Sequence, residues 1–126
     1  MTQVLRVEHI EVGRNKQLSS VCHQAKNLYN RANYLVKESL RNQKKLLLYY
    51  DLNKLLKEEA CYTILPVHTA QHTLKLLVRN WKGFFQALQE WKKDPSLFYT
   101  RPQPPGYKAK NGEIVAIFST NNLGRY

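Results

Sequence analysis

The residues that most often bind metals or carry catalysis are few in this chain and are poorly placed for it. His68 and His72 are four residues apart, so on a helix both rings would point the same way and could share a metal ion. The sequence HTAQH lacks the glutamate of a metalloprotease helix, and no third ligand is evident. Cys22 and Cys61 lie in no CxxC pair and cannot form a structural zinc site by themselves. We therefore predict no metal and no cofactor, with both histidines solvated or contacting phosphate.

The acidic residues argue against a complete nuclease. Nine are spread along the chain without an obvious metal-binding cluster, whereas two-metal hydrolysis of a phosphodiester needs several convergent carboxylates. A catalytic thiol would need an oriented histidine, and nothing in the sequence supplies one. The sequence therefore predicts that this chain alone is not an enzyme.

The net charge of +11 in 126 residues is the most informative number in the composition. A balance this basic favours a polyanionic partner, with nucleic acid first and an anionic membrane surface second. Most of the excess lies in residues 17–45 and 66–93, where bases far outnumber acids. The longest apolar run, 46–50, is far too short to span a bilayer, and we see no secretory signal, so we expect a cytoplasmic protein.

Two helices precede the centre of the chain. Residues 17–43 carry apolar side chains at the i, i+3, i+4, i+7 spacing of a long amphipathic helix, and Cys22 lies on this stripe as a predicted core residue. Residues 51–60 predict a shorter helix with Asp51 as its N-cap.

Residues 66–93 carry the clearest pattern, because apolar and aromatic residues from Val67 to Trp91 recur at alternating spacings of three and four. This heptad-like seam contains bulky aromatics. We therefore expect it to pack on the first helix within the chain, with Trp81 and Phe84 buried there, rather than to form a coiled-coil dimer.

The ends of the chain predict two strands, residues 3–12 and 113–120, which are rich in Val and Ile. Residues 95–112 read as a proline-rich loop without acids, and Asn111-Gly112 is a strong tight-turn signal. A two-stranded ribbon is marginal by itself. The outline thus indicates either a piece of something larger or a helical core with an unfinished sheet.

The polar faces of the two long helices are the positive evidence for nucleic-acid binding. A solvated face usually alternates Glu with Lys, and here the acids are missing, although an exposed face that merely lacks acids would look the same. In the loop, aromatic residues alternate with Lys and Arg, a composition that suits contact with a nucleic-acid backbone. The alternative is that the loop is a plain connector. The predicted contacts are Lys26, Asn30, Lys37 and Arg41 on the first long helix, Lys75, Arg79 and Lys82 on the second, and Arg101, Tyr107, Lys108 and Lys110 in the loop.

Several stretches of the sequence resemble the N-terminal part of the OrfB/TnpB family of insertion-sequence transposase-like proteins. The similarity covers about residues 4–120, and TAQHTLKLLVRNWKGFF followed by RPQPPGYK is its most specific part. The matching stretches are YNRANYLVKESL, YYDLNKLLK, LPVHTAQHTLKLLVRNWKGFFQALQEWKKDP and RPQPPGYKAKNGEIVAIFST. Full-length members are RNA-guided DNA endonucleases, whose nuclease domain and zinc ribbon are absent from this sequence.

The resemblance implies a mainly α fold with a minor β part, in which a helical bundle of two long helices and one short helix is inserted between strands of an incomplete wedge-like β-barrel. The expected divisions are a first wedge strand in 1–16, the helical recognition bundle in 17–93, a basic proline-rich loop in 94–112, and a second wedge strand and tail in 113–126.

The expected function is to hold a guide RNA–DNA duplex, or target DNA, by backbone contacts that position the duplex while base pairing carries the sequence. The expected partners are DNA, guide RNA and a C-terminal nuclease part, with no membrane, in a nucleoid-associated location. Two alternatives stay open: a standalone helical DNA-binding protein left from a decayed insertion sequence, and a structural helical module without a ligand.

Overall fold

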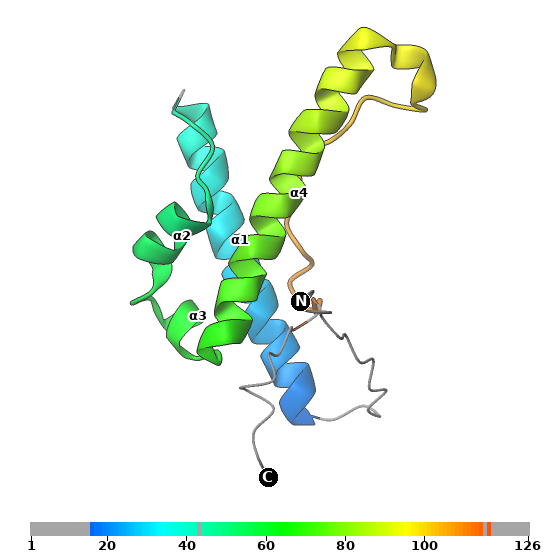
Figure 1. Ribbon diagram of the computed structural model, residues 1–126. Coiled ribbons are helices and arrows are strands. Elements are labelled where there is room, and N and C mark those ends of the chain that lie inside the picture. The colour runs from blue at the N-terminus through cyan, green and yellow to red at the C-terminus, as the bar shows by residue number, and fades with distance from the viewer. Residues whose placement is uncertain (1–15, 43, 115, 117–126) are drawn as a thin grey trace, which may run out of the picture.

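The computed structural model describes residues 16–42, 44–114 and 116, and in this part of the chain the protein is helical (Figure 1). The long helices α1 and α4 pack against each other, and α2 and α3 connect them along one side of the pair (Figure 1). Beyond the bundle, α4 continues to a short 3-10 helix, after which the chain returns beside α4 (Figure 1). The elements are α1 (Lys16–Arg41), α2 (Tyr49–Leu56), α3 (Ala60–Thr63), α4 (Val67–Lys93) and η1 (Pro95–Leu97).

The interface between α1 and α4 forms the centre of the core. It confirms the predicted packing of the two helices and the burial of Trp81, whereas Phe84 is only half-buried. On α1, Leu28 and Val36 are fully buried, and on α4 the same is true of Leu74 and Leu77. Burying a side chain of this size stabilises the fold by roughly 1.5–3 kcal/mol. Val67 at the start of the seam is 54% exposed, because it lies in the first turn of α4 beyond the end of the contact.

Helix α2 begins two residues before the predicted N-cap, so the capping role assigned to Asp51 was misplaced. Leu48 is the N-cap, and its backbone N–H donates to Asp51 Oδ2 at 3.0 Å. A carboxylate at the third helical position can satisfy a free N–H at the helix start as well as one at the N-cap can. The predicted helix over 51–60 is in fact two helices, because residues 57–59 form a turn before α3.

The C-terminal end of α4 falls where the proline predicts it. Lys93 is the last helical residue, and the N–H of Asp94 donates to the carbonyl of Glu90 at 3.0 Å. The Asp94 carboxylate then accepts a bond from the N–H of Ser96 at 3.1 Å, which starts η1. No helix within the described ranges is long and apolar enough to cross a membrane.

The predicted β part is wrong for the residues that the structure describes, because they contain no strand, and hence no sheet or barrel. The turn at Asn111-Gly112 does form, with the Gly112 N–H donating to the Ala109 carbonyl at 2.8 Å. Directly after it, Ile114 packs on the helical core, and its N–H lies 3.5 Å from the Cys22 carbonyl of α1. A strand needs another extended backbone beside it, and here the neighbour is a helix. Residues 3–12 and 117–120 lie outside the described part.

Candidate nucleic-acid interface

Residues 105–110, here called the strap, lie along the polar face of α1 and are fixed to it through backbone atoms. Asn30 makes a reciprocal pair with Lys108: its Nδ2 donates to the Lys108 carbonyl at 3.0 Å, and its Oδ1 accepts from the Lys108 N–H at 2.8 Å. Lys26 Nζ donates to the carbonyl of Lys110 at 2.6 Å. The side-chain amide suits this role because it carries both a donor and an acceptor.

A buried polar junction joins the strap to both long helices. Asn33 is fully buried, and its Oδ1 accepts from Trp81 Nε1 at 2.9 Å, while its Nδ2 donates to the Pro105 carbonyl at 3.1 Å. Both ends of one amide are therefore satisfied inside the protein, as a buried polar group requires. The aromatic seam predicted the burial of Trp81, but nothing local to Trp81 identified Asn33 as its partner.

The four contacts predicted on α1 are thus largely engaged within the protein. Lys26 is only 5% exposed and, like Asn30, it binds the strap. Lys37 places its ammonium group 4.2 Å from the centre of the Tyr107 ring, a cation–π contact. Arg41 lies at the exposed end of α1 and forms an ion pair with Glu38 one turn away.

The three cations predicted on α4 face solvent. Arg79 and Lys82 are exposed, and within the described ranges neither forms an ion pair. Lys75 is also exposed, and its Nζ lies 5.0 Å from the centre of the Tyr49 ring. Side chains at these spacings share one face of the helix. Seven residues of helix place the two lysines about 10 Å apart along the axis.

Several acidic side chains contact residues of α1 and not the cations on this face of α4. Glu59 forms an ion pair with Arg31 of α1 at 3.0 Å, and a carboxylate oxygen of Glu113 lies 3.3 Å from Nε2 of His23, also on α1. On α4 itself, Glu90 comes two turns after Lys82. The positive charge of α4 between Lys75 and Lys82 is therefore not offset by neighbouring acids on its own helix.

Two of the three predicted cations of the loop lie against aromatic rings. The Arg101 guanidinium lies 5.4 Å from the centre of the Trp91 ring near the end of α4. Lys108 Nζ lies 5.3 Å from the centre of the Tyr29 ring, and its backbone is fixed by Asn30. Tyr107 is 51% exposed on the strap and Lys110 is exposed. Such contacts orient a cation and leave its charge in place.

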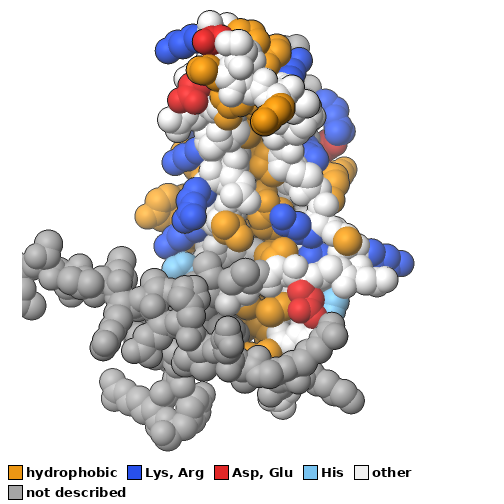
Figure 2. All heavy atoms as spheres, turned by 90° about the vertical axis from the view of Figure 1, so that its right-hand side faces the viewer, with side chains coloured by type: hydrophobic (Ala, Val, Ile, Leu, Met, Phe, Trp, Pro, Cys, Tyr) orange, Lys and Arg blue, Asp and Glu red, His pale blue; other side chains and the backbone are white. Residues whose placement is uncertain are grey.

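One face of the molecule shows how the charge is distributed (Figure 2). Lys and Arg side chains stand along both margins of this face, with apolar and uncharged side chains between them. Acidic side chains are visible mainly near the top of the view, with another low on the right. The surface thus presents separate rows of positive charge, rather than alternating charges.

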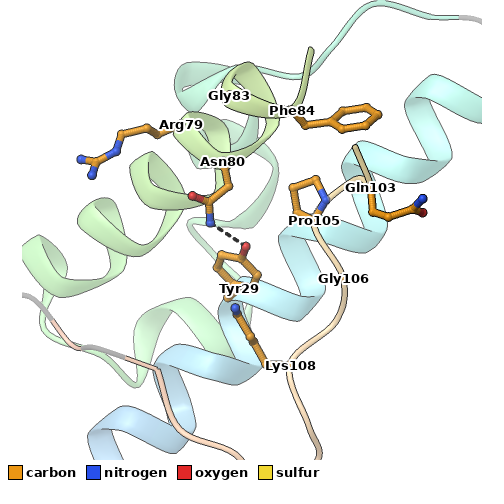
Figure 3. Close-up of a pocket in the computed structure, with 9 residues that line it drawn as sticks. All are labelled: Tyr29, Arg79, Asn80, Gly83, Phe84, Gln103, Pro105, Gly106 and Lys108. Atoms are coloured by element: carbon orange, nitrogen blue, oxygen red, sulfur yellow. Dashed lines mark hydrogen bonds between the residues drawn. The ribbon is translucent and has the colours of Figure 1, made fainter. Parts of the chain in front are cut away.

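A hollow of about 510 Å³ lies where α1, α4 and the strap meet, and it is here called the groove (Figure 3). On its floor, Asn80 Nδ2 donates to the Tyr29 hydroxyl at 2.9 Å. Lys108 points toward Tyr29 from the strap, whereas Arg79 and Gln103 extend outward on opposite sides (Figure 3). The lining residues are Tyr29, Arg79, Asn80, Gly83, Phe84, Gln103, Pro105, Gly106 and Lys108.

Within the described ranges, the histidines and cysteines do not assemble into a site. Burial lowers the pKa of His72, and the nearby charges of Lys75 and His68 lower it further, so the ring is neutral at pH 7. Burial raises the pKa of the Cys61 thiol, which disfavours the reactive thiolate. The described part of the chain contains no group of three or more His, Cys, Asp or Glu residues that could hold a metal ion.

Comparison of the chain with protein-family models, with curated proteins and with solved structures finds no match in any of the three.

Proposed function

We propose that this chain binds nucleic acid through the sugar–phosphate backbone, with the exposed face of α4 as its main contact surface. The observation that carries the proposal is the row of Lys75, Arg79 and Lys82, which is exposed and without an ion-pair partner in the described part of the chain. Uncompensated cations in a row repel one another, and contact with phosphates removes this repulsion. The contact also releases counterions from the nucleic acid, which favours binding.

The strap extends this surface. Lys108 and Lys110 lie on the strap, and the strap is bound to α1 by side-chain-to-backbone hydrogen bonds, so its cations keep a defined position relative to α4. The α1 residues Lys26 and Asn30 therefore act as supports for the contact surface. Pre-positioned charges lose less conformational freedom on binding than charges on an unsupported loop.

The resemblance of the sequence to the N-terminal part of TnpB-like transposases suggests which nucleic acid and which partner this chain binds. The ligand is then a guide RNA–DNA duplex or the adjacent target DNA, and the protein contacts set position while base pairing sets sequence. A C-terminal nuclease part is the implied partner, and the implied location is the cytoplasm, at the nucleoid. The helical bundle is the recognition element in this proposal.

A salt titration of binding tests the proposal. Each phosphate contact contributes about −0.9 to the slope of log K against log salt on duplex DNA. Replacing Lys75, Arg79 and Lys82 together by Gln should flatten that slope by about 2 to 3. Glutamine keeps the length and the helix propensity of the side chains, and circular dichroism checks that the variant is folded.

A matched variant controls for the loss of overall charge. Lys44, Lys54 and Lys57 are also exposed, lie outside α4, and replacing them by Gln removes the same number of charges. That variant should keep the wild-type slope. Equal slopes for the wild type and for the folded α4 variant would refute the proposed contact surface. A lack of binding by the wild type at low salt would instead support a structural module without a ligand.

A further inference from the structure

Gly83 has no structural reason to be glycine. It lies in the interior of α4, where glycine is a poor helix former, and a Cβ atom added there would meet nothing within 4 Å. Close packing of a neighbour therefore does not account for it. Gly83 is one of the residues that line the groove, and as glycine it places no side chain there (Figure 3).

The strap keeps the groove open in the same way. A Cβ atom on Gly106 would also meet nothing within 4 Å, and Gly106 lines the groove opposite α4. Small-molecule sites commonly have volumes of about 300–1,000 Å³, and the groove has about 510 Å³. Its volume and the absence of side chains at these two glycines thus leave room for a small bound group.

The lining defines the chemistry of that ligand. Phe84 provides an apolar ring, which is held edge-on against Trp81 with the ring centres 5.8 Å apart. Asn80 provides an amide next to the Tyr29 hydroxyl. Lys108 provides positive charge beside Tyr29, Arg79 extends outward from the edge of the groove, and none of the lining residues is acidic. An aromatic ring, an amide and a cation together suit a planar polar ring attached to an anion.

We infer that the groove binds one unpaired nucleotide of a nucleic acid held on α4, with its base beside Phe84 and its phosphate at Lys108. This inference rests on the proposed function, because Arg79 belongs both to the cationic face of α4 and to the groove. A nucleic-acid strand that runs along the cationic face of α4 reaches the groove at Arg79. Bases paired and stacked within a duplex cannot enter it, so the groove selects single-stranded or flipped-out positions.

The test compares fluorescent DNA probes at one salt concentration: a blunt duplex, the same duplex with a few unpaired thymidines, and that extended duplex with the unpaired bases removed as abasic sites. Stacking of one base on an aromatic side chain corresponds to roughly a fivefold or greater gain in affinity. The extended probe should bind at least about fivefold more tightly than the blunt probe. The abasic extension should lose that gain.

Three variants connect the gain to the groove. Gly83→Gln places a side chain at the wall of the groove and should abolish the gain while blunt-duplex binding persists. Gly83→Ala adds only a methyl group in open space and should keep most of the gain. Ala60→Gln adds the same side chain at an exposed position of α3 that does not line the groove, and should change neither affinity. Both Gly83 variants replace glycine by a better helix former, so α4 remains folded.

The outcomes separate this inference from the proposed function. Blunt-duplex binding with the expected salt slope, but without a gain from unpaired bases, would overturn the groove assignment and leave the proposed function intact. An undiminished gain in Gly83→Gln would overturn it as well, because the base would then bind elsewhere. Failure of the wild type to bind any probe would overturn both.

Discussion

The buried junction at Asn33 should control both the stability of the protein and the position of the strap. Asn33→Ala leaves the indole N–H of Trp81 buried without its acceptor, which costs about 1–3 kcal/mol. It also removes the bond to the Pro105 carbonyl, a further ~0.5–1.5 kcal/mol. We therefore expect the free energy of unfolding to fall by about 2–4 kcal/mol, a large part of the typical total of about 5–15 kcal/mol.

Urea unfolding followed by circular dichroism measures this loss, and a second substitution isolates its cause. Trp81→Phe removes the indole N–H but keeps an aromatic ring in the core. In that background Asn33→Ala should cost about 1–2 kcal/mol less than in the wild type, because no donor is left unsatisfied. Asn27 is exposed on the same helix, so Asn27→Ala should change stability by less than about 0.5 kcal/mol.

Hydrogen exchange at the Lys108 amide reports the effect on the strap. That N–H donates to Asn30, and releasing Pro105 from Asn33 should make the strap open more often and speed its exchange. A loss of less than about 0.5 kcal/mol for Asn33→Ala, or no coupling between Asn33 and Trp81, would refute the reasoning. The junction would then be an incidental contact.

Other expectations concern the core, a histidine and catalysis. Trp81→Ala should lower the free energy of unfolding by about 3–5 kcal/mol in urea titrations; a loss below ~1 kcal/mol would mean that its burial contributes little. The lowered pKa of His72 means that the unfolded chain binds its proton first, so stability should fall as pH drops below the ordinary value of about 6.5. In His72→Gln that part of the pH dependence, measured as the urea midpoint from pH 5 to 8, should disappear; an unchanged profile would exclude His72 as its source. The purified chain with Mg²⁺ should leave supercoiled plasmid intact, because the sequence predicts no cluster of carboxylates that could hold catalytic metal ions. Nicking activity that copurifies with the chain would contradict this.

The apolar spacing was sufficient to predict the two long helices and their contact. A helix places residues three and four apart on one face, so the seam of α4 and the stripe of α1 each define a surface that must be covered. Leu28 and Leu77, on facing helices, are both fully buried as expected. Helix boundaries were predicted less well, because Asp51 can cap from inside the first turn as well as from the N-cap position.

The expected sheet illustrates the opposite case. A segment rich in Val and Ile favours an extended chain, but whether that chain becomes a strand depends on a partner that the local pattern does not specify. Where the structure describes this region, Ile114 lies against α1 and packs on the helical core. The apolar character of the segment was predicted, and its neighbour was not.

The amino-acid sequence by itself determined which face of α1 is polar, and only the tertiary structure decided what that face does. Lys26, Asn30 and Asn33 share a face because of helical geometry, which depends only on their spacing. Asn30 and its partner Lys108 are 78 positions apart. Whether an amide faces water or a backbone carbonyl depends on where the returning chain lies. That position is set by the buried junction of Trp81 with Asn33, and no short-range pattern encodes it. On α4 the cations stay exposed, because the returning chain binds α1 through its backbone and leaves that face of α4 uncovered.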